Sequence, residues 1–360
     1  MTAENFWNGR RVLITGHTGF KGAWLSFWLR EKGAEVFGYS LDPPTDPNLF
    51  QIARIGDVMA GDTRADIRDL STLEDALRRA QPEIVFHLAA QSLVRLSYAI
   101  PVETFDVNVM GTAHLLQAIR RVPSVRAAVI VTSDKCYENL GGGQPYRETD
   151  PMGGHDPYSA SKGCAELVVS SFRSSAAALG PQGADVAIAS VRSGNVVGGG
   201  DWSPDRLVPD CIRSFAAGVP VKIRSPGALR PWLHVLEPLV GYLSLAERLL
   251  GTDFSRFATA FNFGPASDNE ANVLQVAQAV AKLWGNQARV EVAGGTHLPE
   301  AETLRLDSTK ASQLLGWRPR WALTETLERA VDWYKAWQAG RDVRPLMARQ
   351  VADFAAAAGK

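Results

Sequence analysis

Cysteine is scarce in this sequence, and the spacing of the few cysteines excludes two classes of protein. Cys136, Cys164 and Cys211 are odd in number and far apart, with neither a CxxC pair nor the Cys/His spacing of a zinc site. We therefore expect no disulfide framework and no metal. Three reduced thiols are typical of a cytoplasmic protein, because disulfides are rare in that compartment.

An excess of charge and long apolar runs are also missing. The 38 Lys and Arg residues balance 38 Asp and Glu residues, so neither nucleic acid nor an anionic membrane is an expected partner. No apolar run is long enough to span a bilayer, and residues 1–10 lack the basic-then-apolar layout of a secretory signal. We expect a cytoplasmic protein in which individual cationic side chains meet any anionic ligand.

Short apolar runs alternate with amphipathic segments along the first half of the chain. The runs predict strands at 11–15, 35–39, 57–61, 84–88, 127–131, 186–191 and 261–263. Helices are predicted at 22–32, 71–80, 103–121, 273–283 and 323–337, the second of them opening with a capping box from Ser71 to Glu74. The pattern predicts an α/β fold, a Rossmann-type doubly wound parallel sheet with a smaller C-terminal α/β domain.

A glycine-rich loop follows the first predicted strand. Gly16, Gly19 and Gly22 stand three residues apart just before a helix, where backbone N–H groups can approach a pyrophosphate. The alternative is an ordinary glycine-rich turn, but the order of strand, loop and helix favours a dinucleotide site. Other predicted cofactor contacts in the loop are Thr18, Phe20 and Lys21. His17 and Lys21 could tune cofactor affinity, although we expect Lys21 to point to solvent.

The end of the second strand indicates which dinucleotide is bound. Ser40 holds the position where an acid would bind the 2′-hydroxyl of NAD, and Asp42 follows shortly after it. No arginine, which would suit the 2′-phosphate of NADP, is nearby in the sequence. NAD is therefore the expected cofactor.

Tyr158 and Lys162 form a YxxxK pair, whose spacing puts both side chains on one face of a helix. A neighbouring ammonium would lower the tyrosine pKa from about 10 toward the range of a general base. Such pairs also occur by chance on solvated helices. The position of Tyr158 and Lys162, downstream of the glycine loop and of Ser133, favours a catalytic role for this pair.

Taken in order, these motifs resemble the signature set of the extended short-chain dehydrogenase/reductase family. The resemblance rests on the glycine loop, His87–Gln91, Thr132–Asp134, the YxxxK pair and Arg192–Gly198, and it covers the chain from Arg11 to about Trp337. It implies that Ser133 completes a catalytic triad with Tyr158 and Lys162. It also implies cofactor contacts at Asp66, Ile67, Leu88, Ala89 and Ala90.

The same resemblance implies a division into domains and an assembly. Residues 1–191 would bind the dinucleotide, with 233–264 returning to that domain. Residues 192–232 and 265–345 would bind the substrate. Relatives of this kind pair through two helices, which implies a homodimer.

Asp134 indicates the type of reaction. An acidic residue directly after the catalytic serine marks the sugar-nucleotide 4,6-dehydratases, in which a C4 ketone acidifies the C5 proton and a carboxylic acid protonates the departing C6 hydroxyl. Asp134 could instead cap a turn. Lys135 stands where most such enzymes have a glutamate as the C5 base. A neutral lysine could be that base, or a charged one could polarise the ketone, and the sequence leaves this open.

Lys135 also narrows the substrate. With Gly198–Trp202, Asp205–Pro209 and Arg230–Val235, it is similar to the CDP-glucose 4,6-dehydratases. By this resemblance the substrate-binding residues are Gln91, Asn195, Arg206, Leu207 and Arg230. Arginine forks suit a diphosphate in a protein without net charge, although Arg206 could equally form an ordinary ion pair.

We therefore expect a hydro-lyase that uses NAD to convert a nucleotide-activated glucose, by resemblance CDP-D-glucose, into its 4-keto-6-deoxy derivative. The implied context is deoxysugar biosynthesis for O-antigen or lipopolysaccharide. A nucleotide-sugar 4-epimerase is the main alternative. A non-catalytic NAD-binding regulator is a remote one, because Tyr158 and Lys162 are intact.

Overall fold

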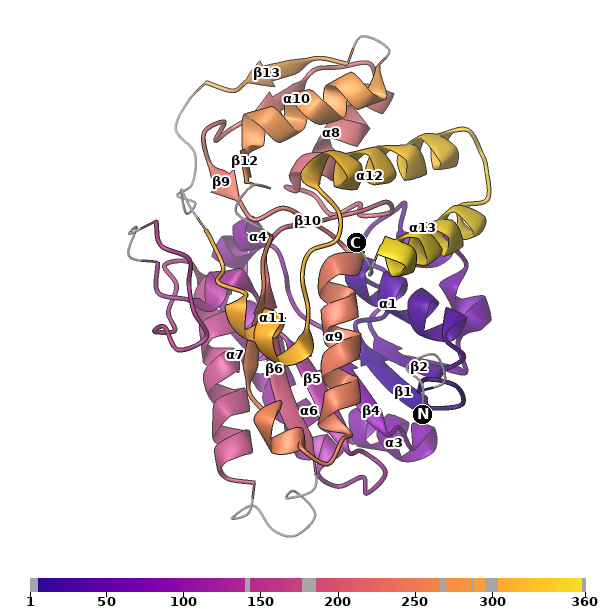
Figure 1. Ribbon diagram of the computed structural model, residues 1–360, viewed down its shortest axis with the longest axis vertical. Coiled ribbons are helices and arrows are strands. Elements are labelled where there is room, and N and C mark those ends of the chain that lie inside the picture. Colours follow the sequence, from indigo (N-terminus) through magenta and orange to yellow (C-terminus); the bar gives the residue numbers. More distant parts are fainter. Residues whose placement is uncertain are drawn as a thin grey trace.

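The computed structural model describes residues 6–139, 143–176, 186–265, 270–285, 288–294 and 304–357. Its centre is a sheet of seven parallel strands in the order β11-β6-β5-β4-β1-β2-β3 (Figure 1). The strands are β1 (Arg11–Thr15), β2 (Glu35–Ser40), β3 (Gly61–Arg64), β4 (Ile84–His87), β5 (Ala127–Val131), β6 (Ala187–Ser193) and β11 (Ala260–Phe263). Strand order reverses between β1 and β4, and a ligand crevice forms at such a point beyond the carboxyl ends of the strands.

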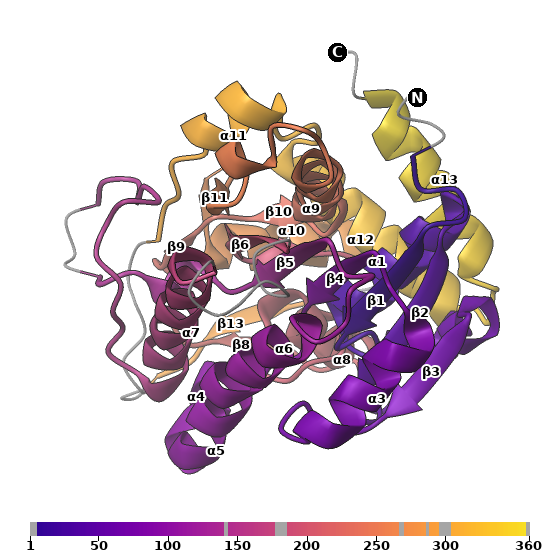
Figure 2. The same cartoon turned by 90° about the horizontal axis from the view of Figure 1, so that it is seen from below.

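Successive side chains of β1 point to opposite faces of the sheet, and each face packs its own helices. Val12 and Ile14 join one core with Trp24, whereas Leu13 joins the other with Leu77. The first face is covered by α1 (Phe20–Glu31), α9 (Leu236–Leu249) and α13 (Arg344–Ala356). The second face is covered by α3 (Leu70–Ala80), α6 (Gly111–Ile119) and α7 (Pro157–Ser174), so the sheet lies between two helical layers (Figure 2).

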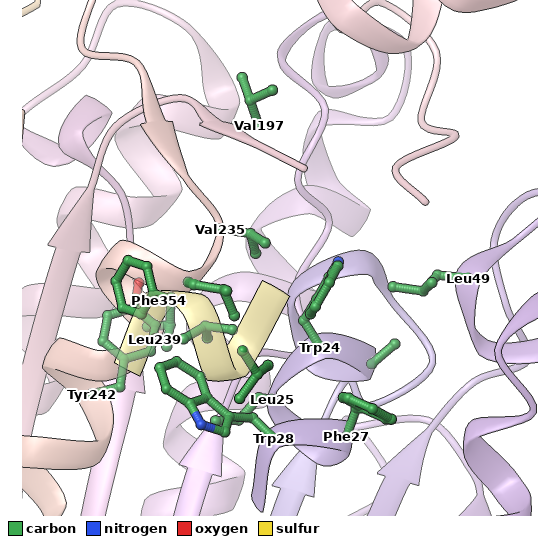
Figure 3. Close-up of a cluster of buried hydrophobic side chains, with 14 of the residues drawn as sticks. Trp24, Leu25, Phe27, Trp28, Leu49, Val197, Val235, Leu239, Tyr242 and Phe354 are labelled. Carbon is green, nitrogen blue, oxygen red and sulfur yellow. The ribbon is translucent and has the colours of Figure 1, made fainter. Parts of the chain in front are cut away.

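Aromatic rings close the first of these cores. Figure 3 shows Trp24 and Trp28 of α1 beside Leu239 of α9 and Phe354 of α13. The rings of Trp28 and Phe354 meet edge to face, with 5.9 Å between their centroids. Burial of such large rings fixes α1, and with it the glycine loop that precedes α1, against the rest of the domain.

A smaller lobe stands beyond the carboxyl ends of the central strands, above the sheet in Figure 1. Its helices are α8 (Leu207–Ala216), α10 (Val273–Trp284) and α12 (Leu323–Gln338). The paired short strands are β7 (Val196–Val197) with β10 (Leu233–His234), β9 (Leu229–Arg230) with β12 (Ala271–Asn272), and β8 (Val221–Ile223) with β13 (Val290–Val292). The remaining elements are α2 (Leu49–Ile52), η2 (Ile55–Val58), α4 (Val94–Ala99), α5 (Pro101–Phe105), η3 (Asp106–Met110), η4 (Asp134–Cys136), η5 (Phe254–Arg256) and α11 (Thr309–Leu315).

The structure corrects two local predictions. The third strand lies at 61–64 rather than 57–61, because residues 55–58 form a 3₁₀ turn that buries Ile55 against the core. The capping box at Ser71 is wrong as well. Asp69 caps α3 instead, since its carboxylate accepts the Thr72 N–H at 3.0 Å and the helix already begins at Leu70.

Cys136, Cys164 and Cys211 are all free thiols. Within the described ranges, no group of His, Cys, Asp and Glu side chains could hold a metal ion. No helix of the described part of the chain is both long and apolar enough to cross a membrane.

Candidate active site

A cavity of about 650 Å³ lies between the carboxyl ends of the central strands and the smaller lobe. Its lining includes every residue predicted for catalysis, cofactor or substrate, with the exception of Gln91. The Gln91 amide oxygen instead accepts the Leu93 N–H at 2.5 Å, and its amide nitrogen donates to the Thr104 hydroxyl at 2.9 Å. The Gln91 side chain therefore shapes its own loop.

The glycine loop is closely packed where it meets the cavity. Gly16 has a φ of +77°, and a Cβ there would lie 2.6 Å from the backbone nitrogen of Ala89. A Cβ on Gly22 would lie 2.1 Å from the Gly16 carbonyl oxygen. Gly19, at the N-cap of α1, supplies no side-chain cap to the first helical N–H groups. The start of α1 is therefore suited to a pyrophosphate group.

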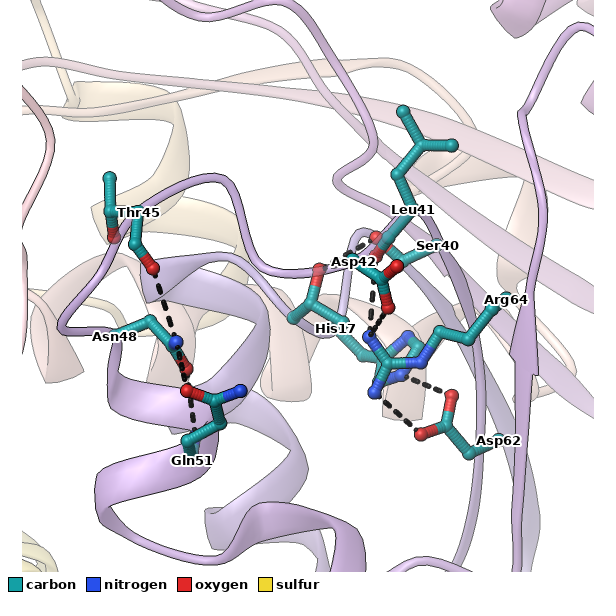
Figure 4. A network of polar contacts seen from close by, with 10 residues as sticks. His17, Ser40, Leu41, Asp42, Thr45, Asn48, Gln51, Asp62 and Arg64 are labelled. Carbon is teal, nitrogen blue, oxygen red and sulfur yellow. Dashed lines mark hydrogen bonds and ion pairs between the residues drawn. The ribbon is translucent and has the colours of Figure 1, made fainter.

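An arginine, Arg64, lies beside the end of β2, although no arginine is near that strand end in the sequence. Register pairs Ser40 of β2 with Arg64 of β3. The Arg64 guanidinium lies 2.7 Å from the Asp62 carboxylate and 3.6 Å from that of Asp42 (Figure 4). Ser40 itself shares a 2.8 Å hydrogen bond with the Thr18 hydroxyl. The positive charge of Arg64, which would favour the 2′-phosphate of NADP, is thus already paired with two carboxylates.

His17 and Lys21 occupy opposite sides of the glycine loop. His17 is fully buried beneath Gly38, away from the cavity lining, and its Nε2 lies 2.9 Å from the Asp62 carboxylate (Figure 4). Lys21 lines the cavity, and its ammonium donates to the Ser193 hydroxyl at 2.8 Å. The expectation that Lys21 points to solvent is wrong. Burial, reinforced by the charge of Arg206, lowers the pKa of Lys21 to about 7.

Tyr158 and Lys162 enter the cavity from the first turns of α7. Asp156 caps this helix by accepting the Ser159 N–H at 2.9 Å. Burial raises the pKa of Tyr158 to about 12, although a hydrogen bond with Ser133 opposes this rise. The expected lowering of the tyrosine pKa by the lysine is therefore wrong for the protein alone, because desolvation dominates. Burial also lowers the pKa of Lys162 to about 8.

Asp134 is a buried carboxyl group that faces the same cavity. Ser133 donates its hydroxyl to Asp134 Oδ1 at 3.0 Å and accepts the Lys135 N–H at 3.2 Å. Asp134 Oδ2 has no hydrogen-bond partner among the described residues, and the side chain is almost fully buried. Burial raises the pKa of Asp134, while the cations of Lys135 and Arg230 act to lower it. A carboxyl group in this setting is suited to donate a proton.

Two arginines at the cavity were missed by the sequence analysis. Arg95 and Arg224 both bind the carboxylate of Asp205, at 2.8 Å and 2.7 Å. Arg206, the neighbour of Asp205, lies 3.8 Å from the carboxylate of Asp201. Arg95 and Asp205 are 110 positions apart in the chain, so no local motif could have paired them. Asp205 has a φ of +60°, the left-handed conformation that Asp tolerates better than most residues.

This fold and this cavity define a member of the extended short-chain dehydrogenase/reductase class. A family model described as GDP-mannose 4,6 dehydratase matches residues 13–330, so the chain belongs to that family. A CDP-glucose 4,6-dehydratase of Salmonella typhimurium is 51% identical over 360 residues, which is 99% of each chain.

Two solved structures resemble the chain at lower identity. UDP-glucose 4-epimerase of Thermus thermophilus, solved in complex with NAD, has a TM-score of 0.75 and 26% identity over 90% of this chain and 99% of its own. MoeE5, solved with UDP-glucose and NAD, has a TM-score of 0.75 and 25% identity over 91% of this chain and 99% of its own.

Proposed function

We propose that this protein is a hydro-lyase that converts CDP-glucose into CDP-4-keto-6-deoxyglucose with bound NAD. The observation that carries the reaction type is the buried Asp134 carboxyl, which opens into the same cavity as Tyr158 and Lys162. The assignment of CDP as the nucleotide is supported by full-length similarity to a CDP-glucose 4,6-dehydratase.

The cavity has the features that an NAD molecule requires. The start of α1 would hold the pyrophosphate, Ser40 and Asp42 the adenosine ribose, and Asp66 and Ile67 the adenine. Leu88, Ala89 and Ala90 follow β4 and would lie against the nicotinamide. NAD, when bound, supplies the acceptor for the C4 hydride and the donor that returns it to C6. We propose on this basis that residues 1–191 and 233–264 hold the cofactor and that 192–232 and 265–345 hold the substrate.

Tyr158 and Asp134 divide the proton transfers between them. Tyr158, assisted by Ser133 and Lys162, removes the proton of the C4 hydroxyl while the hydride leaves C4. Asp134 then protonates the C6 hydroxyl, which departs as water when the C5 proton is removed. The hydride returns to C6 and a proton to C5, so one water is lost and no NAD is consumed. Lys135 lines the cavity beside Asp134 and is one candidate for the C5 base.

Cationic side chains of the smaller lobe would hold the nucleotide diphosphate. Arg206, Arg224 and Arg230 all line the cavity, together with Asn195 and Leu207. Arg230 is 5% exposed, so its charge is largely withdrawn from water and would bind a diphosphate strongly. Gln91 would act only through the shape of its loop.

The function is tested by incubating the purified protein with NAD and, in turn, CDP-, dTDP-, GDP- and UDP-glucose. We expect an alkali-sensitive 4-keto product from CDP-glucose, at a kcat/KM at least about tenfold above the other three. NADH, followed by its absorbance at 340 nm, should not accumulate during steady turnover, because the hydride is returned to the sugar. Turnover of dTDP-glucose but not of CDP-glucose would overturn the proposed substrate but not the proposed type of reaction. Conversion of glucose to galactose would favour the 4-epimerase.

A homodimer in the cytoplasm is the assembly we propose. Large apolar side chains are exposed on the neighbouring helices α4, α5 and α7, which lie together in Figure 2: Leu96, Val102, Phe105 and Leu167. Val102 is 73% exposed and Leu167 61% exposed. We propose that these side chains, on three adjoining helices, form an interface patch, since exposed apolar surface is typical of a protein interface.

An acidic residue in this patch should separate the two copies. We expect Val102→Asp to change the mass measured by light scattering from two chains to one, because the carboxylate would be buried without a partner. Val219→Asp is the matched control, since Val219 is 52% exposed on the smaller lobe. An unchanged mass for Val102→Asp would place the interface elsewhere.

A further inference from the structure

A buried ion pair lies beneath the cavity but does not line it. The Arg192 guanidinium of β6 and the Glu166 carboxylate of α7 are 2.7 Å apart, and their side chains are 5% and 4% exposed. Such a pair is costly to bury unless further hydrogen bonds satisfy both partners. Here those hydrogen bonds lead to the two ends of one short segment, the turn from Ser133 to Cys136.

The first end of the turn is held by Glu166. Thr132, directly before Ser133, donates its hydroxyl to Glu166 Oε1 at 2.5 Å. The other carboxylate oxygen accepts from Ser190 at 2.7 Å as well as from Arg192. The Glu166 carboxylate is therefore fixed on both oxygens, and it fixes the residue that leads into the turn.

The second end of the turn is held by Arg192. Its Nη1 donates to the hydroxyl of Tyr137, directly after Cys136, at 2.6 Å. The Tyr137 hydroxyl in turn donates to Asn262 Oδ1 at 2.7 Å. The Tyr137 ring is 2% exposed and stacks on Tyr146, with 4.9 Å between the centroids.

The same pair is also tied to the helix that carries Tyr158 and Lys162. Glu166 follows Lys162 by one helical turn and Tyr158 by about two, on the same side of α7. A displacement of Glu166 or Arg192 would therefore move the turn relative to the helix. Asp134 stands on the turn, and Tyr158 stands on the helix.

We propose that Glu166 and Arg192 are positioning residues that act through Thr132 and Tyr137 to hold Asp134 in register with Tyr158. The inference rests on the proposed dehydratase function. Tyr158 acts at C4 and Asp134 at C6 of one sugar ring, so the two groups must keep a fixed separation. A shift of about 1 Å in a reacting group can cost on the order of 100-fold in rate. Loosening the turn should therefore slow the elimination of water more than the oxidation at C4.

Tyr137→Phe tests this coupling with the smallest change. The variant keeps the buried ring and the ion pair but removes the hydroxyl that joins Arg192 to the turn. Arg192 Nη1 retains an acceptor in the Glu148 carbonyl oxygen at 3.3 Å. Tyr146→Phe is the matched control, because it loses a hydroxyl from the stacked partner ring, where that group donates to Asn139.

Stopped-flow absorbance at 340 nm with CDP-glucose and NAD separates the two steps. For Tyr137→Phe we expect NADH to form within about threefold of the wild-type rate and then to persist, with kcat lowered about tenfold and KM within about twofold. Thr132→Val, which frees the other end of the turn, should show the same persistent NADH signal. Tyr146→Phe should behave as the wild type.

Two results would overturn the inference. One is a Tyr137→Phe variant indistinguishable from Tyr146→Phe. The other is an equal slowing of NADH formation and of overall turnover in both turn variants, since the turn would then act through Ser133 on oxidation at C4 and not specifically through Asp134. A wild-type protein that forms no 4-keto product would instead overturn the proposed function, so the two failures are told apart.

Discussion

Asp134→Asn is expected to form NADH from CDP-glucose and NAD but to release the 4-keto-6-deoxy product far more slowly than the wild type. We expect product formation to fall by about 10²- to 10⁴-fold, the range for loss of a general acid. The reason is that Asp134 is buried with its pKa raised, so it can hold a proton for the departing C6 hydroxyl. Asparagine has nearly the same shape and can accept the Ser133 hydrogen bond, but it has no acidic proton to give. Quenched single-turnover assays, with absorbance at 340 nm, measure both steps.

The matched control for this variant is Asp69→Asn. Asp69 caps α3 and does not itself line the cavity, and asparagine is an equally good N-cap. A 4-epimerase would keep most of its activity in Asp134→Asn, because epimerisation eliminates no water. Retention of wild-type dehydration would exclude Asp134 as the acid. Loss of NADH formation as well would show that Asp134 chiefly orients Ser133.

The parts of the site that could be predicted from the sequence are those set by local geometry. Gly22 is glycine because a Cβ there would lie 2.1 Å from the carbonyl oxygen of Gly16, six residues earlier in the same strand, loop and helix. Tyr158 and Lys162 are brought together by one turn of a single helix. Such features depend on neighbours in the chain, so their spacing carries the information.

The parts that could not be predicted depend on partners distant in sequence. Lys21 looks like a loop lysine until β6 brings the Ser193 hydroxyl to within 2.8 Å of it. Arg64 meets Ser40 only through the register of β2 with β3. Asp205 joins Arg95 to Arg224 across the cavity, and no periodicity marks such a contact. The third strand was misplaced for a related reason, since an edge strand of polar residues has no apolar alternation.

Tyr158→Phe should stop the reaction one step earlier than Asp134→Asn. We expect the rate of NADH formation to fall by about 10²- to 10⁴-fold, because the phenylalanine cannot remove the C4 hydroxyl proton. Burial holds the pKa of Tyr158 at about 12, so the wild-type group depends on Ser133, on the charge of Arg206 and on the proposed Lys162 ammonium to act as a base near neutral pH. The stopped-flow assay at 340 nm with CDP-glucose gives the rate directly.

The pH profile of the wild-type protein tests whether the Lys162 ammonium supports Tyr158 as a base. Burial lowers the pKa of Lys162 to about 8, so its ammonium is present below about pH 8 and is lost as the pH rises through that value. If the ammonium supports Tyr158, the rate of C4 oxidation should fall above about pH 8, and Lys162→Met should be slow at every pH without this fall. A wild-type rate that rises steadily to pH 10 would instead show that ionisation of Tyr158 alone limits oxidation. NADH formation by Tyr158→Phe at the wild-type rate would exclude the tyrosine as the base and leave Lys162, already neutral in part near pH 8, as the group that accepts the proton.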